Sequence, residues 1–465
     1  MMSEAIAAII GAGPAGFYTA EQLLAAGFAV DLYDALPTPF GLVRAGVAPD
    51  HPKIKSVTRV YERAAKRPGF RFFGGVELGS DITRAELLER YHAVLYAVGT
   101  SSDNRLGVSG EERPGSVPAT EFVAWYNGHP DFADHVFDLS CSRAIVIGNG
   151  NVALDVARML VLDPDELEVT DVADHAIVPF RQAAVREVVL LGRRGPAQAA
   201  FTNPELRELG DLSRADVFVD PLELELDEHS AAWLASDAAS ATARRNLEIL
   251  REYAARVPAG KSHRIELRFL RSPVALIGED ETGPVTGLRV AVNRLEPNGR
   301  GNLRAVATDA RELIECGLVV RSIGYRGQPL PGVPFDEQRG LIRNHAGRVI
   351  GEDGVPLAGE YAVGWIKRGP SGVIGTNKKD AAETVAHVLA DAAAGALNQP
   401  PAGGDAEEIA SWLATSVTGL VTWEGWNAID AHEQRSGKPQ GRPRVKLVRV
   451  PEMVAIADGR VPAHS

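Results

Sequence analysis

The chain has 465 residues, too many for one hydrophobic core, so two or three domains are expected. Hydrophobic residues make up 45% of it and charged residues 24%, and no apolar run has the ~20 residues that a membrane span needs. The net charge of −12 argues against nucleic-acid binding. Cys141 and Cys316 form no CxxC pair and are too few for a zinc or iron–sulfur site, so we expect no metal and assign redox chemistry to a bound cofactor.

The chain starts with an apolar stretch at residues 5–10 that runs directly into Gly11. It is preceded by Glu4 and has no basic flank, which is not typical of a signal or transit peptide. We expect a buried parallel strand and a cytoplasmic protein that binds no membrane.

The first glycine turn is GAGPAG at residues 11–16, with GxGxxG spacing. Residues 17–26 are predicted to form a helix and residues 29–34 a second strand, which ends at Asp34 about 20 residues after the turn. This order is typical of a dinucleotide site, in which an acid binds the adenosine ribose. Asp34 favours a ribose with a free 2′-hydroxyl, as in FAD or NAD.

Each glycine of that turn has its own structural role. Gly11 permits the tight turn, Gly13 lets the backbone approach a pyrophosphate, and Gly16 lets the helix pack on the strand. The N-terminus of the helix then offers free N–H groups and a positive dipole end to the phosphates.

A second glycine turn, GNGNVA at residues 148–153, follows the apolar strand 142–148 with GxGxxA spacing. The next strand, residues 187–192, ends in Arg193 and Arg194 instead of an acid. Two guanidiniums suit a 2′-phosphate, through charge-assisted bonds that can be bidentate. The alternative is an ordinary basic pair at a strand end. We interpret the two turns as sites for different ligands, FAD at the first and NADPH at the second.

Several longer segments carry a resemblance to a known family. Residues 41–55, 146–158, 192–196 and 363–380 and the tail motif GRPRVKL at 441–447 resemble the signatures of the adrenodoxin-reductase-like ferredoxin–NADP reductases, of the actinobacterial type. The resemblance covers nearly the whole chain.

The resemblance implies an α/β fold with two Rossmann-like dinucleotide-binding domains, the NADP domain being inserted into the FAD domain. The expected FAD domain comprises residues 1–102 and 325–465, with the tail from about residue 405 included. The expected NADP domain comprises residues 103–324. The crossings fall after the apolar strand 93–99 and around the apolar strand 319–327, both of which end in glycine.

The resemblance also implies the site residues. His51 and Glu208 match the pair that lies by the nicotinamide and the flavin, and are the expected catalytic residues. The expected FAD-binding residues are Gly11, Gly13, Pro14, Ala15, Gly16, Asp34, Leu42, Val76, Trp365, Gly372, Val373 and Ile374. The expected NADP-binding residues are Asn149, Gly150, Asn151, Val152, Arg193, Arg194, Glu205 and Gly372.

Two positions leave alternatives open. After the strand 93–99 the family has a Ser-Asp-Arg run, whereas Asn104 here separates Asp103 from Arg105, so that a phosphate contact is either shifted to Arg105 or weakened. Trp365 follows a strand ending in glycine and precedes a glycine-rich loop. It is expected to stack near the flavin or occupy the nicotinamide's place; the alternative is a core aromatic.

The segment 51–70 is predicted to be helical from Pro52, with apolar residues on one face. Its other face is basic in a chain that is acidic overall. The basic residues are Lys53, Lys55, Arg59, Arg63, Lys66 and Arg67. They favour docking of an acidic iron–sulfur protein, where charge steers encounter, and the alternative is a solvated helix face.

The expected function is that of an FAD-dependent NADPH–ferredoxin oxidoreductase, a cytoplasmic flavoprotein that is monomeric. A hydride passes from NADPH to flavin N5, and single electrons then pass to an iron–sulfur or haem carrier such as an acidic ferredoxin. The alternatives are a non-catalytic NADP(H)-binding redox sensor and a flavin reductase with another acceptor.

Overall fold

The computed structural model describes residues 5–299, 302–401 and 405–460, and it forms two compact units. The first unit contains residues up to Ser102 together with Asn127–Ala133 and the chain from Gly324 onward, and the second contains Asp103–Tyr126 and Asp134–Ile323. Residues 127–133 belong to the first unit in the structure, whereas the expected boundaries placed them in the inserted NADP domain. The buried Lys446 ammonium donates to the Asn127 carbonyl oxygen at 3.1 Å, and this bond ties the segment to the C-terminal tail.

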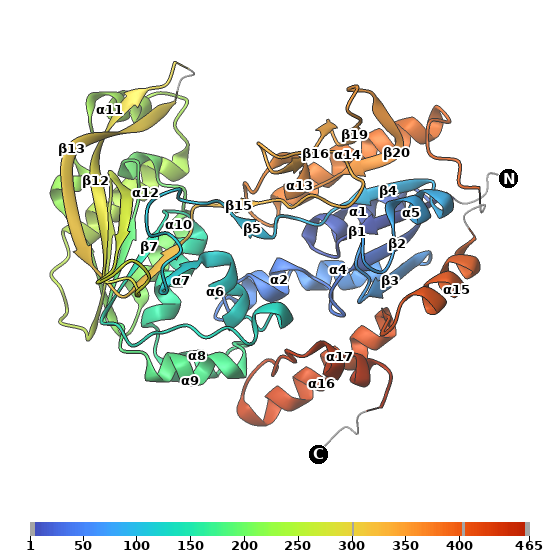
Figure 1. The fold of residues 1–465 in the computed structure, drawn as a ribbon, viewed down its shortest axis with the longest axis horizontal. Helices are drawn as coiled ribbons and strands as arrows, with labels where there is room; N and C mark the ends of the chain where they lie inside the picture. Colours follow the sequence, from blue (N-terminus) through green and yellow to red (C-terminus); the bar gives the residue numbers. More distant parts are fainter. Residues whose placement is uncertain (1–4, 300–301, 402–404, 461–465) are drawn as a thin grey trace. The chain divides into compact units, whose positions relative to one another are not determined.

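The first unit is built on an eight-stranded sheet whose central strands are parallel (Figure 1). Across the sheet the strands are β18 (Asn344–His345), β19 (Arg348–Ile350), β20 (Pro356–Ala362), β4 (Ala93–Tyr96), β1 (Ile6–Ile10), β2 (Ala29–Asp34), β3 (Phe70–Gly74) and β21 (Val421–Thr422). β1 is buried along its whole length, as expected for a strand covered on both faces. The chain adds β2 and β3 on one side of β1 and β4 on the other, so the strand order reverses at β1, directly before the first glycine turn.

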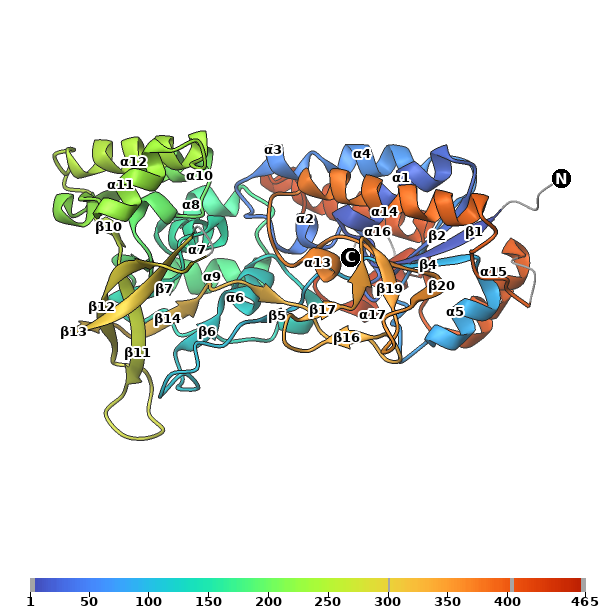
Figure 2. The same cartoon turned by 90° about the horizontal axis from the view of Figure 1, so that it is seen from above.

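Helices cover both faces of this sheet, and Figure 2 shows α1, α4 and α14 together on one of them. The helices of the first unit are α1 (Pro14–Ala25), α2 (Leu42–Ala45), α3 (Pro52–Lys55), α4 (Thr58–Ala65), α5 (Arg84–Arg90), α13 (Trp365–Arg368), α14 (Thr376–Ala393), α15 (Ala406–Ser416), α16 (Trp423–Gly437) and α17 (Val450–Ala457). Among the described helices of either unit, none combines the length and the apolarity that crossing a bilayer requires.

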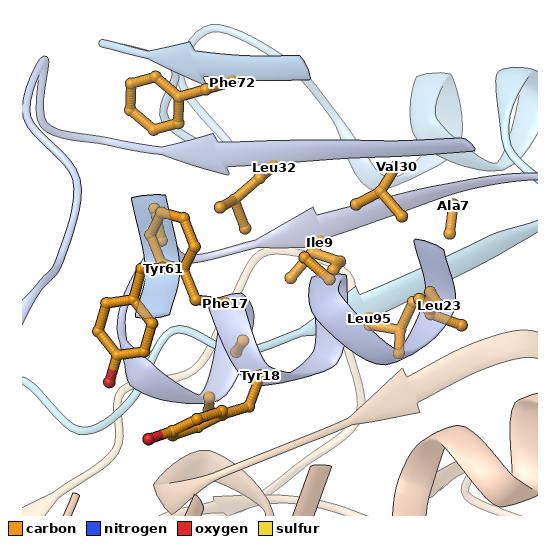
Figure 3. Close-up of a cluster of buried hydrophobic side chains, with 14 of the residues drawn as sticks. Ala7, Ile9, Phe17, Tyr18, Leu23, Val30, Leu32, Tyr61, Phe72 and Leu95 are labelled. Atoms are coloured by element: carbon orange, nitrogen blue, oxygen red, sulfur yellow. The ribbon is translucent and has the colours of Figure 1, made fainter. Parts of the chain in front are cut away.

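The core under α1 combines aliphatic and aromatic side chains (Figure 3). Phe17 on α1 stacks on Tyr61 of α4, with ring centroids 4.9 Å apart, and packs beside Leu32 of β2. These contacts bring α4 onto the same face of the sheet as the helix that follows the first glycine turn.

The helix expected over residues 51–70 is interrupted. α3 and α4 are separated by Ser56 and Val57, and the hydroxyl of Ser56 donates to the carbonyl oxygen of Lys53 at 2.6 Å. Such a side-chain bond competes with the helical ladder, which is a physical reason for the break.

The second unit contains a six-stranded parallel sheet and a three-stranded antiparallel sheet. The parallel strands are, in order, β6 (Ser116–Pro118), β14 (Leu318–Arg321), β7 (Arg143–Ile147), β8 (Glu187–Leu191), β10 (His263–Arg268) and β9 (Ala215–Val219). The antiparallel strands are β11 (Arg271–Ile277), β12 (Gly287–Pro297) and β13 (Leu303–Glu315). The order reverses at β7, directly before the second glycine turn, just as it does at β1.

The helices of the second unit are α6 (Ala119–Tyr126), α7 (Asn151–Val161), α8 (Pro164–Glu168), α9 (Asp174–Gln182), α10 (Asn203–Glu208), α11 (Glu228–Ala235) and α12 (Ala241–Ala254). α8 and α9 lie in the acidic stretch that separates the second glycine turn from β8. The expected α/β fold with two Rossmann-like parallel sheets is therefore confirmed.

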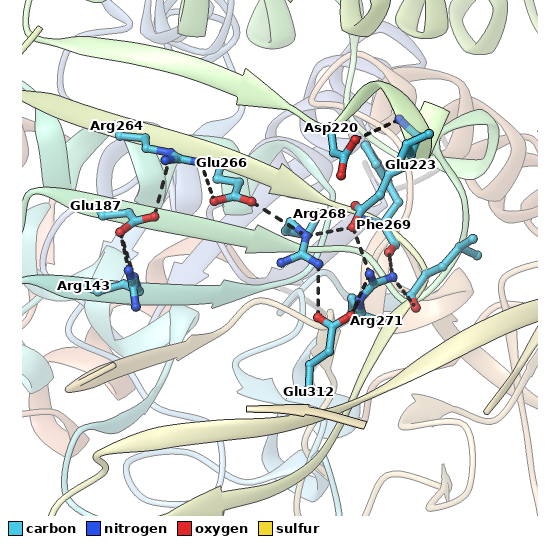
Figure 4. Close-up of polar contacts among 12 residues, drawn as sticks. Arg143, Glu187, Asp220, Glu223, Arg264, Glu266, Arg268, Phe269, Arg271 and Glu312 are labelled. Atoms are coloured by element: carbon cyan, nitrogen blue, oxygen red, sulfur yellow. Dashed lines mark hydrogen bonds and ion pairs between the residues drawn. The ribbon is translucent and has the colours of Figure 1, made fainter. Parts of the chain in front are cut away.

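A cluster of ion pairs joins the two sheets of the second unit (Figure 4). Glu312 of β13 pairs with both Arg268 and Arg271, and Glu223 pairs with the same two arginines. The chain between the two arginines is held to the end of β8, because the Leu270 amide donates to the Arg194 carbonyl oxygen at 3.1 Å. The cluster thus supports the strand end that carries the two candidate phosphate-binding arginines.

Candidate functional site

In the first glycine turn, two glycines are required by the protein itself. Gly11 has a φ of 110°, and a Cβ there would lie 2.6 Å from the carbonyl oxygen of Ala97. A Cβ at Gly16 would overlap the carbonyl oxygen of Gly11. These two positions therefore need glycine for the turn and for the packing of helix on strand.

Gly13 is different. Its φ of −81° suits any residue, and a Cβ there would have no heavy atom of the described chain within 4 Å. α1 begins at the next residue, Pro14, and no side chain caps its N-terminus. Neither backbone conformation nor packing explains glycine here, whereas close approach of a phosphate to the uncapped N–H groups does.

Asp34 lies at the end of β2, with its carboxylate turned to the glycine turn. Its oxygens accept from the Ala12 amide at 2.8 Å and from the Leu36 amide at 3.0 Å. Burial raises the pKa of Asp34 to about 6, although both amides act to lower it. Each oxygen keeps a further lone pair, so a ribose hydroxyl can still donate to this carboxylate.

The other residues expected at FAD come from further segments of the first unit. The Val76 amide donates to the Asp34 carbonyl oxygen at 2.9 Å, which sets this residue beside the strand end. Leu42 begins α2 and is 39% exposed. A Cβ at Gly364 would lie 2.6 Å from the Ala15 Cβ, so the turn before α13 packs on the first turn of α1.

Trp365 begins α13 and is half-buried. Its ring centroid lies 5.4 Å from that of Tyr325, and its buried Nε1 has no hydrogen-bond partner among the described residues. An unsatisfied buried donor beside a glycine turn fits a ligand acceptor. The place of Trp365 beside a cofactor stays a prediction, which this buried donor favours over a core aromatic.

Gly372, Val373 and Ile374 form the entry to α14, which also lacks a side-chain cap. Val373 is 56% exposed although it is apolar, whereas Ile374 packs against the core of the first unit. An exposed apolar side chain at an uncapped helix entry fits a surface that a planar ligand covers.

The second glycine turn repeats the pattern of the first. Gly148 has a φ of 142°, and a Cβ there would overlap the carbonyl oxygen of Ser322. Gly150 has a φ of −106°, and a Cβ there would have no described heavy atom within 4 Å. α7 follows without a side-chain cap, and Ala153 takes the place of the third glycine in a fully buried position.

One asparagine of this turn bonds to the protein, and the other has a side-chain donor available for a ligand. The Asn151 Oδ1 accepts from the Thr202 amide at 2.8 Å, and so it holds the loop before α10. The Nδ2 of Asn149 is buried without a partner among the described residues, and Val152 is half-buried in the first turn of α7. Asn149 therefore has a donor available for a phosphate.

Arg193 and Arg194 follow β8, the first exposed and the second half-buried. Burial lowers the pKa of Arg194, and the neighbouring Arg193 charge lowers it further. In the described part of the chain, no carboxylate pairs with either guanidinium. Two adjacent cations without a counter-ion among the described residues fit a dianionic phosphate. The Oε2 of Glu205 is buried and no described group donates to it, so it fits a hydroxyl or amine of a bound adenosine.

His51 and Glu208 belong to different units, so their pairing stays a prediction. His51 is 8% exposed and stands directly before α3. Glu208 ends α10 with its side chain 43% exposed, and its carboxylate lies 3.8 Å from the buried guanidinium of Arg158. Arg158 also pairs with Asp155 at 2.8 Å, so α7 supports the end of α10.

Arg105 is mostly exposed and pairs with the carboxylates of Glu111 and Glu112. The buried Arg321 also lies near Glu111, at 3.6 Å. Arg105 thus has acidic partners in this structure, and its contact with a phosphate stays a prediction.

Sequence reasoning missed two supports of the site. Asp380 accepts from the Gly364 amide at 2.5 Å and pairs with the buried Lys367 at 3.1 Å, which fixes the turn before α13. Ala12 binds Asp34 through its amide. The charged pair lies inside a segment that resembles the family, but nothing in the pattern shows that its members face each other.

We expect Gly150→Ala to weaken NADPH binding about tenfold, because the methyl group enters the space of the pyrophosphate. The free energy of unfolding and the FAD content should not change, since the methyl group meets no protein atom. Gly13→Ala is the matched control and should weaken FAD binding while leaving NADPH binding unchanged. Equilibrium titration of each variant measures both affinities; loss of stability without loss of either affinity would contradict the assignment.

We expect the affinity of the apoprotein for FAD to fall as pH drops through about 6, by up to about tenfold per pH unit. A ribose hydroxyl bound there would donate to the ionised carboxylate of Asp34, so protonation would compete with binding. Asp34→Asn should bind FAD more weakly and without this pH dependence. A pH profile of the variant that follows the original protein would exclude Asp34 as the titrating group.

Comparisons with known proteins agree with this geometry. A model of the pyridine nucleotide-disulphide oxidoreductase family matches residues 7–190. The chain is 50% identical to the NADPH-ferredoxin reductase FprA of Mycobacterium leprae, over 97% of this chain and 98% of that protein. It is 40% identical to the mitochondrial NADPH:adrenodoxin oxidoreductase of Salvelinus fontinalis, over 97% of this chain and 90% of that protein.

Among solved structures, the chain is similar to Mycobacterium tuberculosis FprA in complex with NADPH, with a TM-score of 0.91 and 47% identity. The match covers 98% of this chain and all of the other. These full-length similarities confirm the expected resemblance, and the chain belongs to the family of adrenodoxin-reductase-like ferredoxin–NADP reductases.

Proposed function

We propose that the chain is an FAD-dependent NADPH–ferredoxin oxidoreductase, with FAD in the first unit and NADPH in the second. The observation that carries the proposal is the difference between the two strand ends. Asp34 offers an acceptor to a ribose hydroxyl, whereas Arg193 and Arg194 offer two cations without a counter-ion among the described residues. The names of the relatives support NADPH as donor and ferredoxin as acceptor.

Bound FAD supplies the chemistry that links a hydride donor to a one-electron acceptor. The protein supplies binding and orientation. The uncapped N-terminus of α1 binds the pyrophosphate of FAD, and Asp34 fixes its ribose. The uncapped N-terminus of α7 does the same for NADPH, with Arg193 and Arg194 on the 2′-phosphate.

His51 and Glu208 are the proposed catalytic pair. The imidazole of His51 is buried, so its ring nitrogens are shielded from bulk water. The buried guanidinium of Arg158, 3.8 Å from the carboxylate of Glu208, attracts that carboxylate toward α7 and so favours the orientation that a group beside the nicotinamide needs. Orientation of this kind is the main contribution that side chains make to a hydride transfer.

A basic face, formed by Lys53, Arg59, Arg63, Lys66 and Arg67 on and after α3 and α4, is the proposed docking surface for an acidic ferredoxin. All five side chains are exposed, whereas Lys55, which was expected on the same face, is half-buried and donates to the Asn127 Oδ1 at 3.5 Å. The chain as a whole carries a net charge of −12. Such a local contrast steers an acidic partner toward one surface of an otherwise acidic protein. A monomeric state and a cytoplasmic location belong to the same proposal.

Two alternatives remain distinct from this function. A non-catalytic NADP(H) sensor would bind NADPH without reduction of FAD. A flavin reductase with another acceptor would be reduced by NADPH but would not pass electrons to ferredoxin. One rapid-mixing experiment separates the three.

Under anaerobic conditions we expect NADPH to bleach the visible flavin absorbance and oxidised ferredoxin to restore it. Arg59→Glu with Arg63→Glu should slow only the second phase, roughly tenfold at low salt, because the charge of the basic face is reversed. Arg304→Glu with Arg311→Glu makes the same charge change on β13 of the other unit and serves as control. Ferricyanide should reoxidise all variants alike.

Absence of bleaching would favour the sensor, and bleaching without reoxidation by ferredoxin would favour another acceptor. The docking proposal would be contradicted if both double variants slowed reoxidation by ferredoxin equally. It would also be contradicted if the rate of reoxidation by ferredoxin did not change with salt concentration.

A further inference from the structure

The loop 40–51, which contains the short helix α2, begins with a strained backbone next to the first glycine turn. Phe40 has a φ of 86°, which is rare for a residue other than glycine. Its amide donates to the Ala12 carbonyl oxygen at 2.8 Å, and a Cβ at Gly41 would lie 3.1 Å from the Gly13 Cα. A strained conformation of this kind persists only where its surroundings determine it fully.

A buried carboxylate of the C-terminal tail holds this loop. Glu433 of α16 has a side chain with no exposed surface, and it accepts two bonds from Arg44 of α2, at 2.9 and 2.5 Å. It also accepts from Arg444 at 3.1 Å and from the Leu447 amide at 2.8 Å. Burial alone would raise the pKa of Glu433, but the charges of Arg44 and Arg444 outweigh it and lower the pKa, so the carboxylate stays ionised.

Two further contacts join the same loop to the tail. The Lys446 ammonium donates to the Arg44 carbonyl oxygen at 3.1 Å and also to Asn127. The ring of Trp426 meets that of Phe40 edge to face, with centroids 5.6 Å apart. α16 and the GRPRVKL motif therefore contact the loop at the Phe40 ring, at the Arg44 side chain and at the backbone.

Buried ion pairs contribute little net stability, but they specify one arrangement when every partner is satisfied. We propose that Glu433 and Lys446 are positioning residues of the FAD site, which hold the loop from Phe40 to His51 in the conformation of this structure through Arg44. The inference rests on the proposed function, since this loop carries Leu42 and His51. It gives the C-terminal tail a role in cofactor binding beyond completion of the fold.

The test is hydrogen exchange of the peptide 40–51 together with the dissociation constant of FAD, both measured on the full chain purified with its cofactor. In Glu433→Gln the amide hydrogens of this peptide should exchange faster, and FAD should bind about tenfold more weakly, because Arg44 loses its charged partner. The affinity of the second unit for NADPH should not change. Lys446→Met should act in the same direction, and it decides the test if Glu433→Gln does not fold.

Glu424→Gln is the matched control. Glu424 lies in the first turn of the same helix with its side chain exposed, whereas Arg44 and Arg444 both pair with Glu433. The control should leave both readouts as in the original protein. Unchanged exchange and FAD affinity in Glu433→Gln or Lys446→Met, or an equal change in Glu424→Gln, would overturn the proposal.

These readouts require neither NADPH oxidation nor ferredoxin. Failure of electron transfer with a loosened loop would therefore count against the proposed function alone. An active reductase whose variants keep an unaltered loop would count against the positioning role alone.

Discussion

Both nucleotide sites depend on a helix N-terminus that no side chain caps. α1 and α7 each begin directly after the middle glycine of their turn, and their first N–H groups have no side-chain acceptor at the cap position. Such groups are costly to leave unsatisfied, so most helices carry Ser, Thr, Asp or Asn there. The protein has such caps elsewhere, for example Thr83 before α5. Other described helices, such as α9 and α10, also lack a side-chain cap, so what distinguishes α1 and α7 is the open glycine position directly before each, Gly13 and Gly150, where we propose that a phosphate binds.

In the function proposed above, the strand ends then decide which nucleotide each helix binds. β2 ends in a carboxylate that is already oriented by the Ala12 amide, so the acceptor is fixed before a ribose arrives. β8 ends in two adjacent guanidiniums, which repel each other until an anion binds between them. The cluster of Glu223, Arg268, Arg271 and Glu312 holds this second end in place and involves neither cation directly. Similar turns therefore serve unlike ligands.

The sequence predicts the local parts of this arrangement well, because short-range patterns determine them. The apolar runs become β1 and β7, and the glycine spacing appears as two turns with one strained and one open position each. Contacts between residues that are far apart in the sequence depend on the tertiary fold, and no sequence pattern predicts them. Arg44 and Glu433 are separated by 389 positions, and no periodicity connects them. The break at Ser56 depends on a single side-chain bond that a helical pattern does not reveal.

The residues around the cofactors divide in the same way. Val76 and Asp34 are neighbours because parallel strands end at the same edge of the sheet, which the strand order makes predictable. The pairing of His51 with Glu208 depends on how two separate units meet, and resemblance is its only basis. The boundary at residues 127–133 is set by Lys446 from the far end of the chain, so no local signal indicates it.

The central claim is that the ends of β2 and β8 separate the two nucleotides, and cofactor binding by Arg193→Ala with Arg194→Ala tests it most directly. Loss of two charge-assisted bonds, at ~1.5–3 kcal/mol each, should weaken NADPH binding by about a hundredfold or more. Binding of NADH and the content of FAD should stay as in the original protein, and Arg207→Ala, on the neighbouring α10, should change neither. Equal losses for NADPH and NADH would contradict the assignment of the second turn to a 2′-phosphorylated nucleotide.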